Sequence, residues 1–283
     1  MKKEALMPFW KRRRPEKPSA PSPRRGIAFG LASDVGRVRE SNQDQVLASL
    51  TFLPTLSGPM PLGIFLVADG MGGHAGGAVA SMRAVEVVAA HIFRELLLPV
   101  LHGYPPEAIQ DALREAVQEA NLRILSEAQE AGNDMGTTLT GVLLLGERCY
   151  VAHVGDSRLY TYGPEGLRCR TRDHSMVARL LEMGQISAEE ARHHPRRNYL
   201  YQSVGQQEAL EVEVTSFPLD GSHLLLCSDG LWGSLEDEEI ATILQSTDDP
   251  QEACERLIEQ ANAAGGEDNI SVIVVALPPK ASS

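Results

Sequence analysis

The sequence has few cysteines, and their spacing limits the metal and disulfide chemistry that they can support. Its 283 residues include four cysteines, which are widely spaced and form no C-x-x-C pair. A zinc ribbon needs paired cysteines, so this class of metal site is not supported. We therefore expect Cys149, Cys169, Cys227 and Cys254 to be reduced and structural.

Long apolar runs are also missing. No uninterrupted run approaches the ~18 residues that a membrane span needs. Near the N-terminus, Lys11-Arg12-Arg13-Arg14 interrupts any apolar core of the kind that a signal peptide has. We expect no membrane span and a cytoplasmic location.

The chain lacks net positive charge, since its formal net charge is -12 at pH 7. Its basic residues gather in residues 1–25, which hold nine Lys or Arg, two Glu and five prolines. Such a segment cannot pack a core, and we expect a disordered tail; weak attachment to an anionic surface through Phe9 and Trp10 is the alternative. The acidic remainder is expected to repel nucleic acid, and it would need cations to act on an anionic substrate.

Apolar periodicity predicts one folded domain over residues 26–278. Two long helices are expected at 78–98 and 106–131, a polar helical stretch at about 175–195, one helix after Ser234 and one from Asp249 to Gly265. Strands are predicted at 27–33, 44–50, 63–68, 138–145, 148–154, 157–162, 166–170, 211–217, 223–228 and 270–276. Because strands come in blocks and helices in pairs, we expect an α+β fold with antiparallel sheet covered by helix pairs.

Five aspartates stand where predicted strands begin or end. Asp69, Asp156 and Asp229 follow apolar runs, whereas Asp44 and Asp268 come just before strands. A single Asp-Gly pair is ordinary turn chemistry, but rigid strand ends can bring five side chains to one point. Converging carboxylates repel unless they hold cations, and oxygen ligands favour Mg²⁺ or Mn²⁺ over zinc. The pattern predicts a metal-dependent hydrolytic site.

Other motifs fit competing chemistries poorly. The stretch 70–75 fits the dinucleotide-binding spacing G-x-G-x-x-A, but it lies in a block of strands and Asp69 would face the pyrophosphate. Ser157 follows Gly155-Asp156 without a paired base, so a strand-end turn is the better interpretation. No cysteine has an arginine at C-x₅-R spacing, and Asp69-Gly70-Met71 is not D-x-D. Thiolate and aspartyl-phosphate mechanisms are therefore not supported.

An ordered set of short motifs covers nearly all of residues 27–276. The motifs are Ser33-Asp34-x-Gly36-x-x-Arg39-x-x-Asn42-Gln43-Asp44, Asp69-Gly70-Met71-Gly72-Gly73-His74, Gly136-Thr137-Thr138, Gly155-Asp156-Ser157-Arg158, Ser228-Asp229-Gly230-Leu231 and Glu267-Asp268-Asn269. Each is weak alone, but together they resemble the bacterial form of the metal-dependent type-2C serine/threonine protein phosphatases. The resemblance implies a central antiparallel β-sandwich flanked on both faces by pairs of α-helices, with a small helical flap at about 175–197.

The resemblance also implies a binuclear Mn²⁺ or Mg²⁺ centre. In this family pattern Asp69 bridges two ions, and the Gly70 carbonyl is a ligand of one of them. Asp229 and Asp268 complete the coordination of the first ion, and Asp44 holds the second ion largely through water. Asp156 would bind a third, weaker ion.

Two further residues are assigned to the phosphate by the resemblance. Arg39 matches the phosphate-binding arginine, whose planar donors suit a bidentate contact. His74 matches the proposed general acid that protonates the leaving seryl or threonyl oxygen. The implied reaction is hydrolysis of phosphoserine and phosphothreonine by a metal-bound water, with no phospho-enzyme.

The sequence departs from the family pattern at three positions: Gln43 where many members have Glu, Ala78 where many bacterial members have Glu, and Tyr201 where Thr is frequent. Gln43 brings no charge, so a lower affinity for the second ion is expected. No direct ligand is missing, which favours an active enzyme over a weakly active regulatory or binding module; a small-molecule phosphohydrolase is a third possibility. The expected partners are phosphorylated proteins, targets of a serine/threonine kinase in the same cell, and a monomer is expected.

Overall fold

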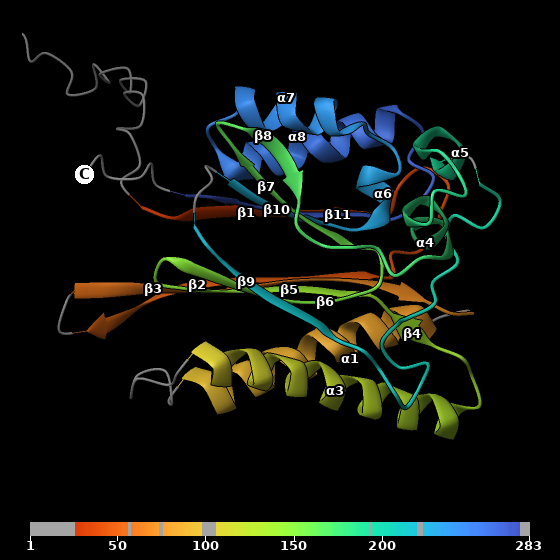
Figure 1. The fold of residues 1–283 in the computed structure, drawn as a ribbon, viewed down its shortest axis with the longest axis horizontal. Helices are drawn as coiled ribbons and strands as arrows, with labels where there is room; N and C mark the ends of the chain where they lie inside the picture. The colour runs from red at the N-terminus through yellow and green to blue at the C-terminus, as the bar shows by residue number, and fades with distance from the viewer. Residues whose placement is uncertain are drawn as a thin grey trace, which may run out of the picture.

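The computed structural model describes residues 26–55, 58–73, 76–97, 106–192, 194–219 and 223–277. Two antiparallel β-sheets lie face to face, and helices cover the outer face of each, so that the molecule has four layers (Figure 1). This arrangement confirms the predicted α+β sandwich flanked by helix pairs.

The first sheet has five strands in the order β1-β11-β10-β7-β8, and all neighbours are antiparallel. Its strands are β1 (Ala28–Asp34), β11 (Ile270–Ala276), β10 (His223–Cys227), β7 (Arg158–Gly163) and β8 (Gly166–Cys169). The last strand of the chain therefore lies between β1 and β10, in the interior of its sheet.

The second sheet has the order β2-β3-β5-β6-β9, and the two-residue strand β4 (Gly136–Thr137) pairs with the end of β3. Its other strands are β2 (Asp44–Thr55), β3 (Gly58–Met71), β5 (Leu139–Leu145), β6 (Arg148–Val154) and β9 (Glu213–Pro218). β2 and β3 pair in one continuous antiparallel register, which places Asp44 opposite Asp69.

Apolar runs in the central strands are explained by burial on both faces. In β3, Phe65 and Val67 point to the core between the sheets, whereas Ile64 and Leu66 point to the core under the helices. Successive side chains of a strand alternate between faces, so a strand inside four layers needs apolar residues at every position.

The second sheet is covered by α1 (Gly76–His91), a π-helical extension (Ile92–Leu97) and α3 (Pro106–Ala131). By length and composition alone, the span Gly76–Leu97 could cross a membrane, but 50% of its most apolar window is buried inside the fold. Since α1 packs on β3 and α3, its apolar character is that of a core helix. The π-helical turn ends the regular α-helix at His91, earlier than the predicted 98.

The first sheet is covered by α7 (Asp237–Ser246) and α8 (Pro250–Ala263), with the single turn α6 (Asp229–Trp232) at its end. Asp249 caps α8 by accepting a hydrogen bond from the backbone N–H of Gln251, and Pro250 occupies the first turn. This is the start that the Asp-Pro pair predicts. The turn α6 was not predicted, because four residues carry no periodic signal.

The predicted helical stretch 175–195 is two short helices, α4 (Met176–Glu182) and α5 (Ala188–Arg192), which form the flap beside the sandwich (Figure 1). Gly184 breaks the stretch because its positive φ of 67° is incompatible with a continuing helix. A capping box starts α5: Glu190 N donates to Ser187 Oγ, and Ser187 N donates to Glu190 Oε2.

Candidate active site

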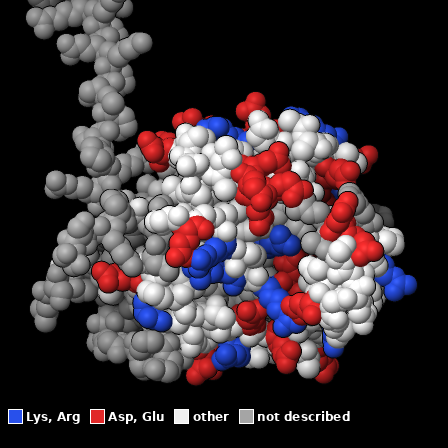
Figure 2. Space-filling model, turned by 45° about the horizontal axis from the view of Figure 1, so that its top comes forward, with Lys and Arg blue, Asp and Glu red and all other residues white. Residues whose placement is uncertain are grey.

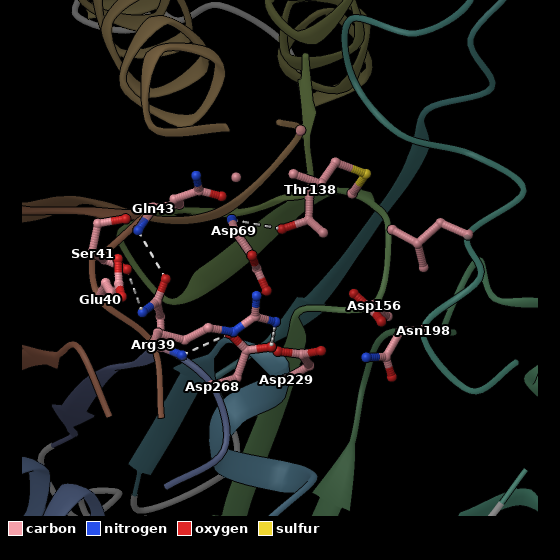
Figure 3. A pocket seen from close by; sticks show the side chains of 15 residues that line it. Arg39, Glu40, Ser41, Gln43, Asp69, Thr138, Asp156, Asn198, Asp229 and Asp268 are labelled. Carbon is pink, nitrogen blue, oxygen red and sulfur yellow. Dashed lines mark hydrogen bonds and ion pairs between the residues drawn. The ribbon is translucent and has the colours of Figure 1, made fainter. Parts of the chain in front are cut away.

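A pocket of about 350 Å³ opens at the end of the sandwich where α6 and the flap lie. Four of the five predicted aspartates line it, together with the predicted arginine and glycine (Figure 3). Its wall includes Arg39, Gln43, Asp69, Gly70, Thr138, Asp156, Asn198, Leu200, Asp229, Asp268 and Asn269. His74, the predicted general acid, lies outside the described residues.

The fifth aspartate, Asp44, lies behind the pocket wall. It is buried at 4% exposure and is the cross-strand partner of Asp69. Its Oδ2 accepts a hydrogen bond of 2.8 Å from Ser228 Oγ, whereas its Oδ1 has no partner among the described residues. The β2–β3 pairing therefore brings together two acidic residues that are 25 positions apart in sequence.

Asp69 lies inside β3, which continues to Met71, rather than after its end as the apolar run suggested. Thr138 fixes the backbone at this point: Asp69 N donates to Thr138 Oγ1 at 2.9 Å, and Thr138 N donates to the Asp69 carbonyl at 2.9 Å. The same Thr138 hydroxyl lies 2.7 Å from Ser157 Oγ, next to Asp156. These bonds tie the backbone of Asp69 to the turn that carries Asp156.

Asp229 and Asp268 approach the pocket from the first sheet. β10 ends just before Ser228, and β11 begins at Ile270, so antiparallel pairing places the two aspartates at the same edge. Asp229 opens α6, and its Oδ1 is buried without a hydrogen-bond partner in the described structure. Carboxylates from both sheets thus face one another across the end of the sandwich.

Crowding and burial raise the pKa of most of these carboxyl groups. Burial raises the pKa of Asp44 to about 7 and that of Asp229 to about 6, and the facing carboxylates add to both shifts. Burial also raises the pKa of Asp69 and Asp156 well above the ordinary range, with repulsion from Asp229 contributing to each. Such a cluster is a poor place for negative charge unless cations join it.

Arg39 is the cation that reaches this cluster from the described residues lining the pocket. Its Nη2 lies 2.6 Å from Asp268 Oδ2, and this hydrogen bond raises the pKa of the guanidinium. The side chain is 53% exposed, and its guanidinium extends toward Asp69, Asp229 and Asp268 (Figure 3). Arg39 can therefore offer N–H groups to an anion while it stays beside Asp268.

Position 70 must be glycine because the backbone of two other segments, at Gly77 and Gln43, lies very close to it. A Cβ at this position would lie 2.1 Å from the Gly77 carbonyl oxygen and 2.6 Å from the Gln43 carbonyl oxygen. Gly70 N also donates to that Gln43 carbonyl at 3.2 Å. Any side chain at residue 70 would push α1 away from β3, so the glycine of the Asp-Gly pair sets the shape of this wall.

The donor set fits hard divalent cations. It consists of carboxylate and carbonyl oxygens, which are the ligands that such cations prefer. Two buried carboxylate oxygens, Asp44 Oδ1 and Asp229 Oδ1, have no hydrogen-bond partner among the described residues, and the carboxylates repel one another. Among the described residues, no three acidic, histidine or cysteine side chains are already arranged around one point. One carboxylate of the set, Asp268, is paired with Arg39.

Asn269 is a positioning residue whose role sequence reasoning missed. Its side-chain amide donates to the carbonyls of Val35 and Ser41, and its Oδ1 accepts from Gln43 N at 2.8 Å. One amide thereby holds the whole loop that carries Arg39 against the start of β11. The pairing of Asn269 with Asp268 in a motif was the available signal, but its partners lie more than 220 positions away.

The acidic pocket at the end of this four-layered sandwich is suited to binding divalent cations and, through them, an anionic substrate. The family model described as protein phosphatase 2C matches residues 40–265, and the chain belongs to this family. It is 38% identical over 248 residues to the serine/threonine phosphatase stp of Listeria monocytogenes, covering 86% of this chain and 93% of that protein.

Solved structures agree with this assignment. The serine/threonine phosphatase PstP/Ppp of Mycobacterium tuberculosis matches with a TM-score of 0.76 and 33% identity, over 90% of this chain and all of that one. The catalytic domain of PstP in complex with 2 manganese ions matches with a TM-score of 0.74 and 32% identity, over 90% of this chain and 99% of that one. The protein is thus a bacterial-type serine/threonine phosphatase of a metal-dependent family, and phosphoproteins are its substrates.

Proposed function

We propose that this phosphatase hydrolyses phosphoserine and phosphothreonine at a binuclear Mn²⁺ or Mg²⁺ centre built from the acidic pocket. The observation that carries the proposal is the convergence of Asp44, Asp69, Asp229 and Asp268 from both sheets, with two partnerless buried oxygens. The manganese complex of the similar PstP domain supports it.

The residues divide the centre between the two sheets. Asp69 and the Gly70 carbonyl, from the second sheet, face Asp229 and Asp268 from the first, so Asp69 is proposed as the bridging ligand. Asp44 is the cross-strand partner of Asp69 and accepts a hydrogen bond from Ser228, next to Asp229; following the family resemblance we assign it to the second ion, and Asp156 to a third, weaker one. Bound divalent ions supply positive charge that lowers the pKa of water and stabilises charge on phosphoryl oxygens.

The chain's own residues position the phosphate. Arg39 is proposed to bind it through the N–H groups that remain beside Asp268, at the pocket mouth. Asn269 holds the Arg39 loop, so the guanidinium is directed at the pocket before substrate arrives. His74 remains a prediction for the general acid, since it lies outside the described residues.

The cellular setting is part of the same proposal. We assign the protein to the cytoplasm, as a monomer that removes the phosphate groups added by a serine/threonine kinase of the same cell. On the face drawn in Figure 2, acidic and basic side chains are interspersed in the described part, and acidic ones are prominent. Such a surface suits protein substrates better than nucleic acid.

The test measures phosphate release from a phosphothreonine peptide with Mn²⁺, with Mg²⁺ and with EDTA. We expect activity with the added ions, none with EDTA, and a loss in Asp229→Ala. Asp111→Ala is the matched control, because Asp111 is a surface aspartate on α3 paired with Arg114. Activity that survives both EDTA and Asp229→Ala would sink the mechanism.

A further inference from the structure

A second cleft, of about 640 Å³, lies between the flap and α3. Its walls include Gln118 and Leu122 from α3, Arg179 from α4, and Tyr201, Gln207 and Glu208 from the segment that leads out of the flap to β9. None of these residues has a part in the proposed centre. The cleft therefore needs an explanation of its own.

The second cleft and the acidic pocket share one wall. Leu200 lines the acidic pocket, and the next residue, Tyr201, lines the cleft. This wall is tied to the base of the flap, because Leu200 forms a β-bridge with Ser175 and Tyr201 N donates to the His174 carbonyl at 2.9 Å. A molecule in the cleft would thus lie one chain thickness from the phosphate site.

The cleft combines apolar surface with three charged side chains, one basic (Arg179) and two acidic (Glu208 and Glu211). Leu122 is 57% exposed and Tyr201 37% exposed, although both are large hydrophobic side chains. Within the described chain, the side chains of Arg179 and Glu208 form no hydrogen bond or ion pair.

We propose that the cleft binds an extended segment of the phosphoprotein substrate, next to its phosphorylated residue; this inference rests on the proposed function. An apolar side chain packs on Leu122 and Tyr201, and an acidic side chain pairs with Arg179. The amide side chain of Gln118, which is exposed at the cleft, hydrogen-bonds the peptide main chain. A phosphoprotein fits best because its phosphate already occupies the far side of the shared wall.

Two surface substitutions test the cleft. Leu122→Gln removes apolar area from an exposed position of a helix, and Arg179→Glu reverses the free charge. Met82→Gln is the matched control, since Met82 is a similarly exposed (48%) apolar residue on α1. Each variant is assayed on a phosphothreonine peptide of about 15 residues with an apolar and an acidic residue beside the phosphate, and on p-nitrophenyl phosphate, which reaches only the acidic pocket.

We expect Leu122→Gln and Arg179→Glu to raise KM for the peptide about five- to tenfold with kcat unchanged, the effect of removing one important contact of a binding surface. Hydrolysis of p-nitrophenyl phosphate should not change, and Met82→Gln should match the wild type on both substrates. A peptide with Lys in place of its acidic residue should bind better to Arg179→Glu than to the wild type. This charge swap identifies a direct contact rather than a structural one.

Unchanged peptide KM in both variants would overturn the inference, as would equal losses on the peptide and on p-nitrophenyl phosphate. Failure of the proposed function looks different, because then the wild type would hydrolyse neither substrate in the presence of Mn²⁺. Thermal unfolding of each variant checks that both substitutions leave the fold intact. A variant that unfolds early is replaced by Leu122→Ser or Arg179→Gln, for which the same outcomes hold.

Discussion

Two groups of buried charge lie side by side in this protein and are built in opposite ways. Arg158 donates to both carboxylate oxygens of Asp173, at 3.0 and 2.7 Å, and its guanidinium lies 3.8 Å from the ring of Trp232. In the acidic pocket, by contrast, Asp44 and Asp229 each have an oxygen without a partner. Trp232 joins the two groups, because its Nε1 donates to the Asp156 carbonyl at 3.0 Å.

The contrast separates a structural use of buried charge from a functional one. Removing one partner of a largely buried ion pair leaves the other charge uncompensated, so Arg158 and Asp173 hold together the elements that carry them. A cluster of like charges costs folding free energy, and it is explained only by cations that bind there. The predictions below test whether each group behaves as its geometry indicates.

The largest effect is expected from Asp229→Asn. The change removes a charge but little volume, so catalysis should fall about a thousandfold, as for loss of a principal electrostatic contact to the reacting group. Stability of the EDTA-treated protein should not decrease, because the lost charge was repelled by its neighbours. Steady-state phosphatase assays measure the loss of activity, and thermal unfolding measures the stability. If Asp229→Asn clearly destabilised the metal-free protein, the acidic cluster would not differ from the Arg158–Asp173 pair as we infer.

The opposite pattern is expected from Asp173→Asn. Arg158 would then be buried without its counter-charge, which costs about 3 kcal/mol of unfolding free energy. Urea unfolding measures the loss, and Asp111→Asn, which disrupts an exposed pair with Arg114, should change stability by less than about 1 kcal/mol. Equal effects from the two substitutions would show that Arg158 and Asp173 contribute no more than a surface pair.

Stability of the metal-free protein should fall as pH rises. The pKa values of Asp44 (about 7) and Asp229 (about 6) are raised from an ordinary 3.8. Below the ordinary value these groups are neutral in both states, but as pH rises toward the folded-state values the unfolded chain ionises more readily and stability is lost. We expect the melting temperature of EDTA-treated protein to drop as pH rises from about 4 to about 7, the interval between the ordinary and the raised pKa values.

The double variant Asp44→Asn, Asp229→Asn supplies the control for this titration. It removes both groups, so its melting temperature should vary less with pH over the same range. Saturating Mn²⁺ should also reduce the drop in the wild type, because ligand binding favours the ionised carboxylates. An identical pH profile in wild type and double variant would assign the titration to other groups.

The smallest effect is expected from Gln43→Glu. Gln43 Oε1 is close to the Gly77 backbone at the pocket wall, where a Cβ on Gly77 would lie 2.5 Å from it. A glutamate has nearly the same shape and adds a charge, so the Mn²⁺ concentration for half-maximal activity should fall a few fold. A metal titration of activity measures the shift, and an unchanged midpoint would mean that residue 43 does not contribute to cation affinity.

Local patterns predicted most of the fold. The helix at Pro106–Ala131 follows from the spacing of Ile109, Leu113, Val117 and Ile124 and from the stop at Gly132. The flap was predicted as one helical stretch, because the polar residues around Gly184 gave no periodic signal to place the break. The turn α6 is held by its packing at the end of the first sheet, which no local pattern reports.

The candidate site could be predicted only as a set of residues. Aspartates at the ends and starts of apolar strands gave the acidic members, and the family resemblance gave Arg39, His74 and the roles. The pairing of Asp44 with Asp69, the Arg39–Asp268 contact and the loop held by Asn269 depend on tertiary register. The second cleft was not visible at all, because its walls come from α3, the flap and the segment before β9.

The interior position of β11 gives this enzyme a built-in order of assembly. Asp268 and Asn269 lie at the start of that strand, and β11 must enter between β1 and β10 before the acidic pocket is complete. Contacts between such distant parts of a chain form late and slowly. A growing chain with only its first two hundred residues made therefore lacks Asp229 and Asp268, and the acidic pocket is complete only when β11 has joined the sheet.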